Sequence, residues 1–153
     1  MDVPAVPAKV DPEALTGVLD GRWASVRRGV RDRMAASAFR DPIGLDLEAH
    51  RAQVLDQLRA LASTDWPGLG FDPEYGGGGD VGGNVTAFEM LGFGDLSLMV
   101  KAGVQWGLFG GAVQLLGTER HHTRYLRAIK DLELLGCFAM TEHGHGSDVQ
   151  RLR

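Results

Sequence analysis

The sequence predicts a mainly α-helical protein in which five or six helices lead into one strand and one polar loop. Apolar residues recur at spacings of three and four through most of the chain, which is typical of amphipathic helices. Asp, Ser or Thr residues suited to N-caps precede these stretches. Only Leu134–Met140, near the C-terminal end, has the composition of a strand, and it leads directly into a loop punctuated by glycines.

Two helices are expected in the first forty residues. Asp11 and Pro12 are typical of the N-cap and first position of a helix, which would run to about Asp20. A second helical stretch covers Gly21–Phe39, because its apolar residues are spaced by 3, 4 and 4 and therefore share one face. These residues are Trp23, Val26, Val30 and Met34.

The clearest helical pattern covers Asp46–Ser63, with Asp46 as its N-cap. Its apolar side is formed by Leu47, Val54, Leu58 and Leu61. Two further helices are expected at about 82–94 and 96–116, with Asp95 or Ser97 capping the second, and an amphipathic helix at Thr118–Asp131.

Four glycines lie inside the helix expected at 96–116. Each costs about 1 kcal/mol against alanine, so they need a compensating reason in the packing. We expect them to let another backbone or a flat ligand approach closely. They are Gly103, Gly107, Gly110 and Gly111.

The charge balance argues against a nucleic-acid-binding protein. Sixteen basic and twenty acidic residues give a net charge of −4, whereas a phosphate-binding surface is normally basic. The arginines of Arg22–Arg33 could form a local basic patch, but they fit the solvated face of a helix better. Leu96–Gly117 is apolar yet contains polar residues, so no membrane span is expected.

The single cysteine, Cys137, excludes an internal disulfide and fits a reducing compartment. Its apolar neighbours predict a buried, inert thiol rather than a nucleophile. The N-terminus lacks the layout of a signal peptide, so a cytoplasmic location is expected.

Two other features could bind a ligand but have simpler interpretations. The run Gly76–Gly79 lacks the Lys-Ser/Thr of a P-loop and is better explained as a turn. His143 and His145 could place two imidazoles together, but no third ligand lies at a familiar spacing, so no metal site is expected.

The most informative stretch is Cys137–Val149, CFAMTEHGHGSDV. A strand that ends in a threonine, followed by glycines and a serine, can offer a hydroxyl and backbone N–H groups to an aromatic cofactor or a phosphate. A tight turn between two strands is the alternative interpretation.

This stretch resembles the flavin-binding signature of the acyl-CoA dehydrogenase and oxidase superfamily. Its Thr141-Glu142 and Gly146-Ser147-Asp148 match that signature, and the Gly-His-Gly-Ser form of Gly144–Ser147 is closer to the oxidases. DPEYGGGGD at 72–80 and LGTERHHTRYL at 116–126 are also similar to the oxidase branch, and the resemblance covers roughly residues 45–153.

The resemblance implies a helical N-terminal domain of the superfamily fold that leads into a β-barrel middle domain. We accordingly divide the chain into an N-terminal arm with helices at 1–45, a helical domain at 46–133 and the start of the middle β-domain at 134–153. The chain would be the N-terminal segment of a longer, homodimeric enzyme.

The implied reaction is the α,β-dehydrogenation of a fatty acyl-CoA, with FAD as cofactor and O2 as electron acceptor. The implied FAD contacts are Phe138, Met140, Thr141, Gly146 and Ser147, and Ser147 would also contact the acyl-CoA. The catalytic glutamate of the family belongs to a C-terminal helix bundle, so no catalytic residue is expected here. Two alternatives stay open: a dehydrogenase that passes electrons to a flavoprotein, and a non-catalytic helical interaction module.

Overall fold

The computed structural model describes residues 10–39, 44–144, 146 and 148–151, and its body is built from helices. The longer helices are α1 (Pro12–Asp20), α2 (Ala24–Ala35), α3 (Leu47–Ala62), α4 (Val81–Leu91) and α5 (Leu96–Ala102). α5 continues through the π-helical segment η5 (Gly103–Gly110) into α6 (Gly111–Leu116). The next helix is built from α7 (Glu119–His121), π-helical η6 (His122–Leu126) and α8 (Arg127–Lys130).

Short 3-10 turns lie between these helices and near the C-terminal end. They are η1 (Gly21–Trp23), η2 (Ser37–Phe39), η3 (Trp66–Gly68), η4 (Pro73–Tyr75) and, near the C-terminal end, η7 (Val149–Arg151). The mainly α-helical class is therefore confirmed.

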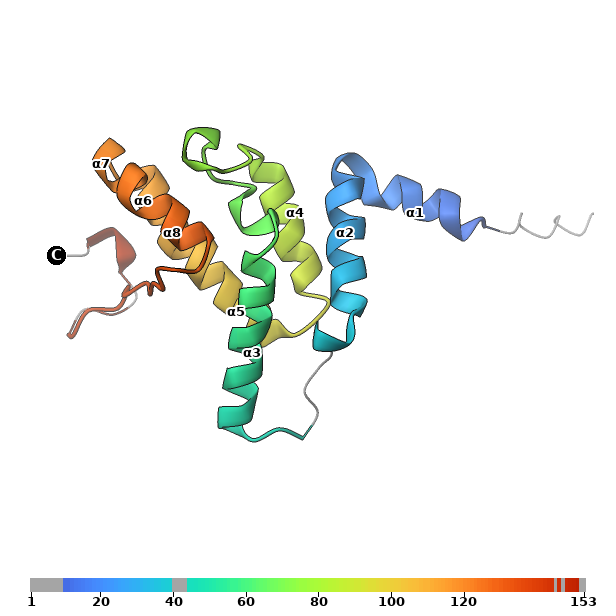
Figure 1. Cartoon of the computed structure of the whole chain (residues 1–153), viewed down its shortest axis with the longest axis horizontal. Coiled ribbons are helices and arrows are strands. Elements are labelled where there is room, and N and C mark those ends of the chain that lie inside the picture. Colours follow the sequence, from blue (N-terminus) through green and yellow to red (C-terminus); the bar gives the residue numbers. More distant parts are fainter. Residues whose placement is uncertain (1–9, 40–43, 145, 147, 152–153) are drawn as a thin grey trace, which may run out of the picture.

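The helices pack side by side around one apolar core (Figure 1). α4 lies between α2 and α5, α3 packs against α5, and α8 packs against η5. Val30 of α2, Leu61 of α3 and Leu98 of α5 are almost completely buried where these helices meet. α1 leaves the end of α2 and points away from the other helices.

The predicted N-caps are formed by acidic side chains. Asp11 accepts a hydrogen bond from the backbone N–H of Glu13 at 2.9 Å, and Asp46 accepts one from that of Ala49 at 2.8 Å. Asp95, rather than Ser97, caps α5 by accepting from the Ser97 N–H at 2.8 Å. Each of these bonds satisfies a donor that the first helical turn leaves free.

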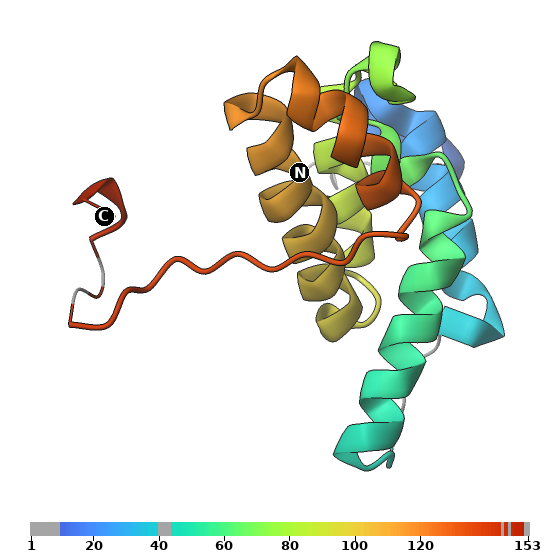
Figure 2. The ribbon, with the colours of Figure 1, turned by 60° about the vertical axis from the view of Figure 1, so that its left-hand side comes forward.

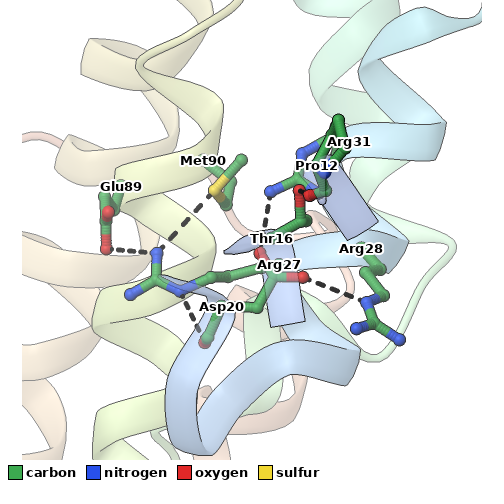
Figure 3. Close-up of polar contacts among 8 residues, drawn as sticks. All are labelled: Pro12, Thr16, Asp20, Arg27, Arg28, Arg31, Glu89 and Met90. Atoms are coloured by element: carbon green, nitrogen blue, oxygen red, sulfur yellow. Dashed lines mark hydrogen bonds and ion pairs between the residues drawn. The ribbon is translucent and has the colours of Figure 1, made fainter. Parts of the chain in front are cut away.

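Arg27, Arg28 and Arg31 of the arginine-rich stretch form hydrogen bonds and ion pairs within the protein (Figure 3). Arg27 donates to the carbonyl of Asp20 at 3.0 Å and forms an ion pair with Glu89 of α4 at 2.7 Å. Arg28 and Arg31 each bind the Asp20 carboxylate at 3.0 Å. These arginines therefore fix α1 and α4 onto α2 and do not form a free basic patch.

The helix Leu96–Leu116 has 21 residues and, by length and composition alone, is long and apolar enough to cross a membrane. Leu98, Ala102 and Trp106 are nevertheless buried against neighbouring helices, and Gln105 is buried with them. In this structure the helix is the central helix of the body.

Only one of the four glycines in this helix has the close packing that we expected of all of them. A Cβ atom added to Gly110 would lie 2.5 Å from Cζ of Phe71, whereas no atom lies within 4 Å of one added to Gly103 or Gly111. Gly107 has ordinary contact distance to Phe88, 4.0 Å. The packing argument therefore holds for Gly110 alone within the described residues.

Candidate functional site

The chain beyond α8 leaves the helical body as an extended segment (Figure 2). The prediction of a strand at Leu134–Met140 is wrong, because no β-strand among the described residues pairs with this segment. Within the described part of the chain, the backbone N–H groups of residues 137–140 have no hydrogen-bond partner. The segment has the backbone of a strand but lacks the neighbour that would form a ladder.

The start of this segment is held by the side chain of Gln105. Its Nε2 donates to the carbonyl oxygens of Leu134 at 2.7 Å and Ile129 at 3.2 Å. Its Oε1 accepts from the N–H of Gly136 at 3.0 Å. Gln105 is only 3% exposed, so these bonds satisfy a carboxamide that would be costly to bury alone.

Two neighbours of Gln105 on η5 support the same anchor. The indole Nε1 of Trp106 donates to the Ile129 carbonyl at 3.1 Å, which ties η5 to the end of α8. The ring of Phe109 lies against Gly136, where a Cβ atom would overlap it. Only glycine allows the segment to pass this close to η5.

A groove of about 600 Å³ lies between α3, α5 and the anchored start of the segment. Its walls are mainly apolar and are formed by Leu47, Val54, Leu55, Leu58, Val100 and Val104. Residues 135–137 form its border on the side of the flavin-like signature. A groove of this size and character can hold an alkyl chain.

His50, Arg51 and Lys101 line the groove and differ in whether they have an ionic partner. His50 lies 3.2 Å from Asp95, and Arg51 pairs with Glu48 at 2.8 Å on the surface of α3. Lys101 lines the groove and is exposed, and it has no ion pair within the described ranges. The groove thus combines apolar walls with basic side chains.

The residues predicted to contact a cofactor lie on the extended segment, beyond the groove. Phe138 and Met140 are 41% and 47% exposed, and Thr141 and Gly146 are exposed as well. Ser147 lies outside the described residues. The structure places Phe138, Met140 and Thr141 on one continuous extended stretch.

Cys137 is exposed and borders the groove, so the prediction of a buried thiol is wrong. Apolar neighbours in sequence predict burial only when another element covers the segment. Here no described element lies on its outer side.

The sequence did not identify Gln105 as a site residue, and it marked the groove-lining residues of α3 only as an apolar helix face. A glutamine in the middle of an apolar, glycine-rich helix is a usable signal for Gln105, because buried amides need several partners. No comparable signal marks the groove, since Val54 and Leu58 have the same periodicity as core residues.

The glycine run Gly76–Gly79 forms a packed turn, as predicted. Gly76 and Gly79 have φ values of 85° and 64°, in the region that favours glycine. The N–H groups of residues 76–80 all donate to backbone carbonyls of the same loop, so none is free for a phosphate.

The histidines of the α7–η6 helix have structural roles. His121 Nδ1 accepts from the N–H of Thr118 at 3.1 Å and completes a capping box. His122 lies edge-on to Tyr75, with 5.3 Å between the ring centroids. Burial, with added repulsion from the Glu74 carboxylate, raises the pKa of the Tyr75 phenol. Among the described residues, no three His, Cys, Asp or Glu side chains gather into a metal-binding group; His145 lies outside them.

Comparison with known proteins places this arrangement in a family. Residues 24–147 match the model of the acyl-CoA dehydrogenase N-terminal domain. The chain belongs to this family. The match includes α2 to α8 and most of the extended segment, so the groove and the candidate flavin contacts Phe138, Met140 and Thr141 are parts of a shared domain.

The similar curated proteins are acyl-CoA oxidases. The peroxisomal acyl-coenzyme A oxidase 2 of Arabidopsis thaliana is 34% identical over 145 residues, which cover 94% of this chain and 20% of that protein. The peroxisomal acyl-coenzyme A oxidase 3 of Homo sapiens is 33% identical over 110 residues, 72% of this chain and 15% of that protein. The chain therefore spans about a fifth or less of the length of these relatives.

The names of these relatives contradict the prediction of a cytoplasmic protein, because both are described as peroxisomal. The absence of a signal-peptide pattern distinguishes only secreted proteins from other proteins. It carried no information about organelles.

Proposed function

We propose that this chain forms the helical part of a flavin-dependent acyl-CoA oxidase that carries out the α,β-dehydrogenation of a fatty acyl-CoA. The observation that carries the proposal is the position of the flavin-like signature: its first residue, Cys137, borders an apolar groove in the helical body. A hydride acceptor and an alkyl-binding groove must be neighbours for this reaction. The oxidase relatives support the same activity.

The groove between α3 and α5 would hold the acyl chain. Its aliphatic walls exclude water, and burial of each methylene group contributes about 0.8 kcal/mol. Residues 135–137 would shield the bound acyl chain from bulk solvent on one side of the groove. This assignment gives the apolar α3 face near Val54 a role beyond core packing.

The extended segment would hold FAD, which when bound accepts the hydride from the acyl chain. The Thr141 hydroxyl would hydrogen-bond the edge of the flavin ring, and Phe138 and Met140 would pack along it. Gly146 and Ser147 would provide close backbone and hydroxyl contacts to the cofactor, and Ser147 also to the acyl-CoA. The exposed side chains and unpartnered N–H groups of the segment fit a group that binds on its surface.

No residue of this chain is assigned the role of the catalytic base. The division at residues 45 and 133, with a β-domain beginning at 134, is part of the same proposal. The unpaired backbone of residues 137–140 supports it, because such an edge can add a further strand. O2 as the electron acceptor is proposed from the oxidase relatives.

The test is FAD retention after free cofactor has been removed, measured by absorbance in the flavin bands. We expect the chain to retain FAD and Thr141→Ala to weaken retention about tenfold, as expected for the loss of one hydrogen bond to a desolvated group. Thr123→Ala is the matched control, since Thr123 is an exposed threonine on η6, away from the segment. Equal retention by both variants would refute the role of Thr141.

A further inference from the structure

The carboxamide of Gln105 contacts the segment at two residues of the same strand-like stretch. Its Nε2 donates to the Leu134 carbonyl at 2.7 Å, and its Oε1 accepts from the Gly136 N–H at 3.0 Å. In an extended chain, residues two apart point their backbone polar groups to the same side. Gln105 therefore offers one donor and one acceptor, as a residue of a paired neighbouring strand would.

We propose that Gln105 is a positioning residue that sets the direction in which the segment leaves the helical body, and thereby the placement of Phe138 and Thr141. This inference rests on the proposed function, in which these residues contact the flavin. Two anchor points define a line, whereas a single hydrogen bond would leave the segment free to pivot. The third bond, to the Ile129 carbonyl at 3.2 Å, fixes the carboxamide itself.

A small change in backbone direction at Gly136 produces a large displacement of Thr141. Thr141 lies five residues beyond Gly136, which is about 17 Å in an extended chain at roughly 3.3 Å per residue. A change of about 10° at Gly136 would therefore move Thr141 by about 3 Å. Binding groups must be held to within about 0.5 Å. Within the described residues, no hydrogen bond from the N–H groups of 137–140 corrects such an error.

A second glutamine provides a matched control for Gln105, because its side chain also holds a loop through two backbone hydrogen bonds, an arrangement called a clamp here. Gln114 of α6 also holds a loop through two backbone bonds: its Oε1 accepts from the Asp72 N–H at 2.9 Å, and its Nε2 donates to the Gly70 carbonyl at 3.1 Å. This clamp acts on the glycine-rich loop and does not touch the segment. Gln114→Leu therefore tests the general cost of removing a clamp from the central helix.

The segment can be followed with two nitroxide labels in a Cys137→Ser background, one on His143→Cys, an exposed site beyond Thr141, and one on Ala52→Cys, an exposed site on α3. Their distance distribution is measured by pulsed electron spin resonance. We expect one narrow distribution in the parent, at least a twofold broader one in Gln105→Leu, and no broadening in Gln114→Leu. Equal widths in the parent and Gln105→Leu, or equal broadening in both variants, would overturn the proposal.

Gln105→Glu adds a readout that simple destabilisation would not produce. A protonated carboxyl keeps one donor and one acceptor, whereas a carboxylate can only accept and would repel two carbonyl oxygens. We expect this variant to show a narrow distribution at about pH 5 and a broad one at about pH 8, because burial favours the neutral form. The same broad distribution at both values would count against the proposal.

FAD retention separates this inference from the proposed function. If Gln105→Leu broadens the distribution and weakens FAD retention about tenfold, both are supported. If the distribution broadens while FAD retention is unchanged or absent in every variant, Gln105 still positions the segment, and the assignment of the segment to the flavin fails.

Discussion

The indole Nε1 of Trp23 donates to both carboxylate oxygens of Asp80, at 3.0 Å each, across 57 positions of sequence. The same carboxylate caps α4 by accepting from the Gly83 N–H at 2.9 Å. Gly82 lies so close to the Trp23 ring that a Cβ atom would overlap it. This contact joins η1 and α2 to the start of α4, which packs between α2 and α5.

Replacing Asp80 by alanine is expected to lower the free energy of unfolding by about 2 to 3 kcal/mol. Loss of an N-cap costs about 1 kcal/mol, and the indole left without an acceptor costs about 1 to 3 kcal/mol more. Asp80→Asn keeps an acceptor and should lose less than half as much. Urea unfolding followed by circular dichroism measures both, and equal losses would show that the charge, not the cap, stabilises the contact.

Gly110 and Gly111 are adjacent in one helix but should respond oppositely to alanine. A Cβ atom on Gly110 would lie 2.5 Å from Phe71 Cζ and 3.2 Å from Ile129 Cγ2, whereas one on Gly111 meets nothing within 4 Å. We expect Gly110→Ala to destabilise the chain by about 1 to 3 kcal/mol through overpacking. Gly111→Ala should stabilise it by up to about 1 kcal/mol through helix propensity.

Thermal unfolding of the two variants compares them directly. The parent melting temperature should lie between those of the two variants. If both variants are stabilised, Phe71 can move aside at low cost and Gly110 is not required by the packing.

The sequence was sufficient to predict the local structure and insufficient to predict the site. Caps such as Asp46, and periodic faces such as that of Val30, are local signals, and the helices formed near the predicted bounds. The segment 134–140 was misjudged because a strand requires a neighbour, which composition cannot reveal. Gln105 was missed because its partners lie 24 to 31 residues away in sequence.

Gly136→Ala tests the close passage of the segment over η5. The added Cβ would overlap the Phe109 ring, so either the ring or the backbone must move. We expect a loss of about 1 to 3 kcal/mol in the free energy of unfolding. In a double-mutant cycle with Phe109→Ala, the space opened by the missing ring should relieve most of that loss, giving a coupling of at least about 1 kcal/mol. Strictly additive losses would mean that Gly136 is needed for its backbone and not for this contact.

Asp20 makes the attachment of α1 sensitive to acid. Its carboxylate is 3% exposed and accepts hydrogen bonds from Arg31 and Arg28 at 3.0 Å, and these bonds lower the pKa of Asp20 below its usual value of 3.8. Because the folded state binds this proton less readily than the unfolded state, the contribution to stability is complete above about pH 4. It is lost as the pH falls through the folded pKa.

Unfolding measured from pH 6 down to pH 2 should therefore show a loss of stability below about pH 4 that is smaller in Asp20→Asn. The asparagine variant should be less stable than the parent at pH 6, because it loses both ion pairs, and the two curves should converge in acid. Arg51→Gln is the control, since it removes the exposed Glu48 pair, and exposed pairs contribute little to stability. Parallel curves for the parent and Asp20→Asn would mean that the acid sensitivity arises elsewhere and that the arginine contacts do not hold α1 in place.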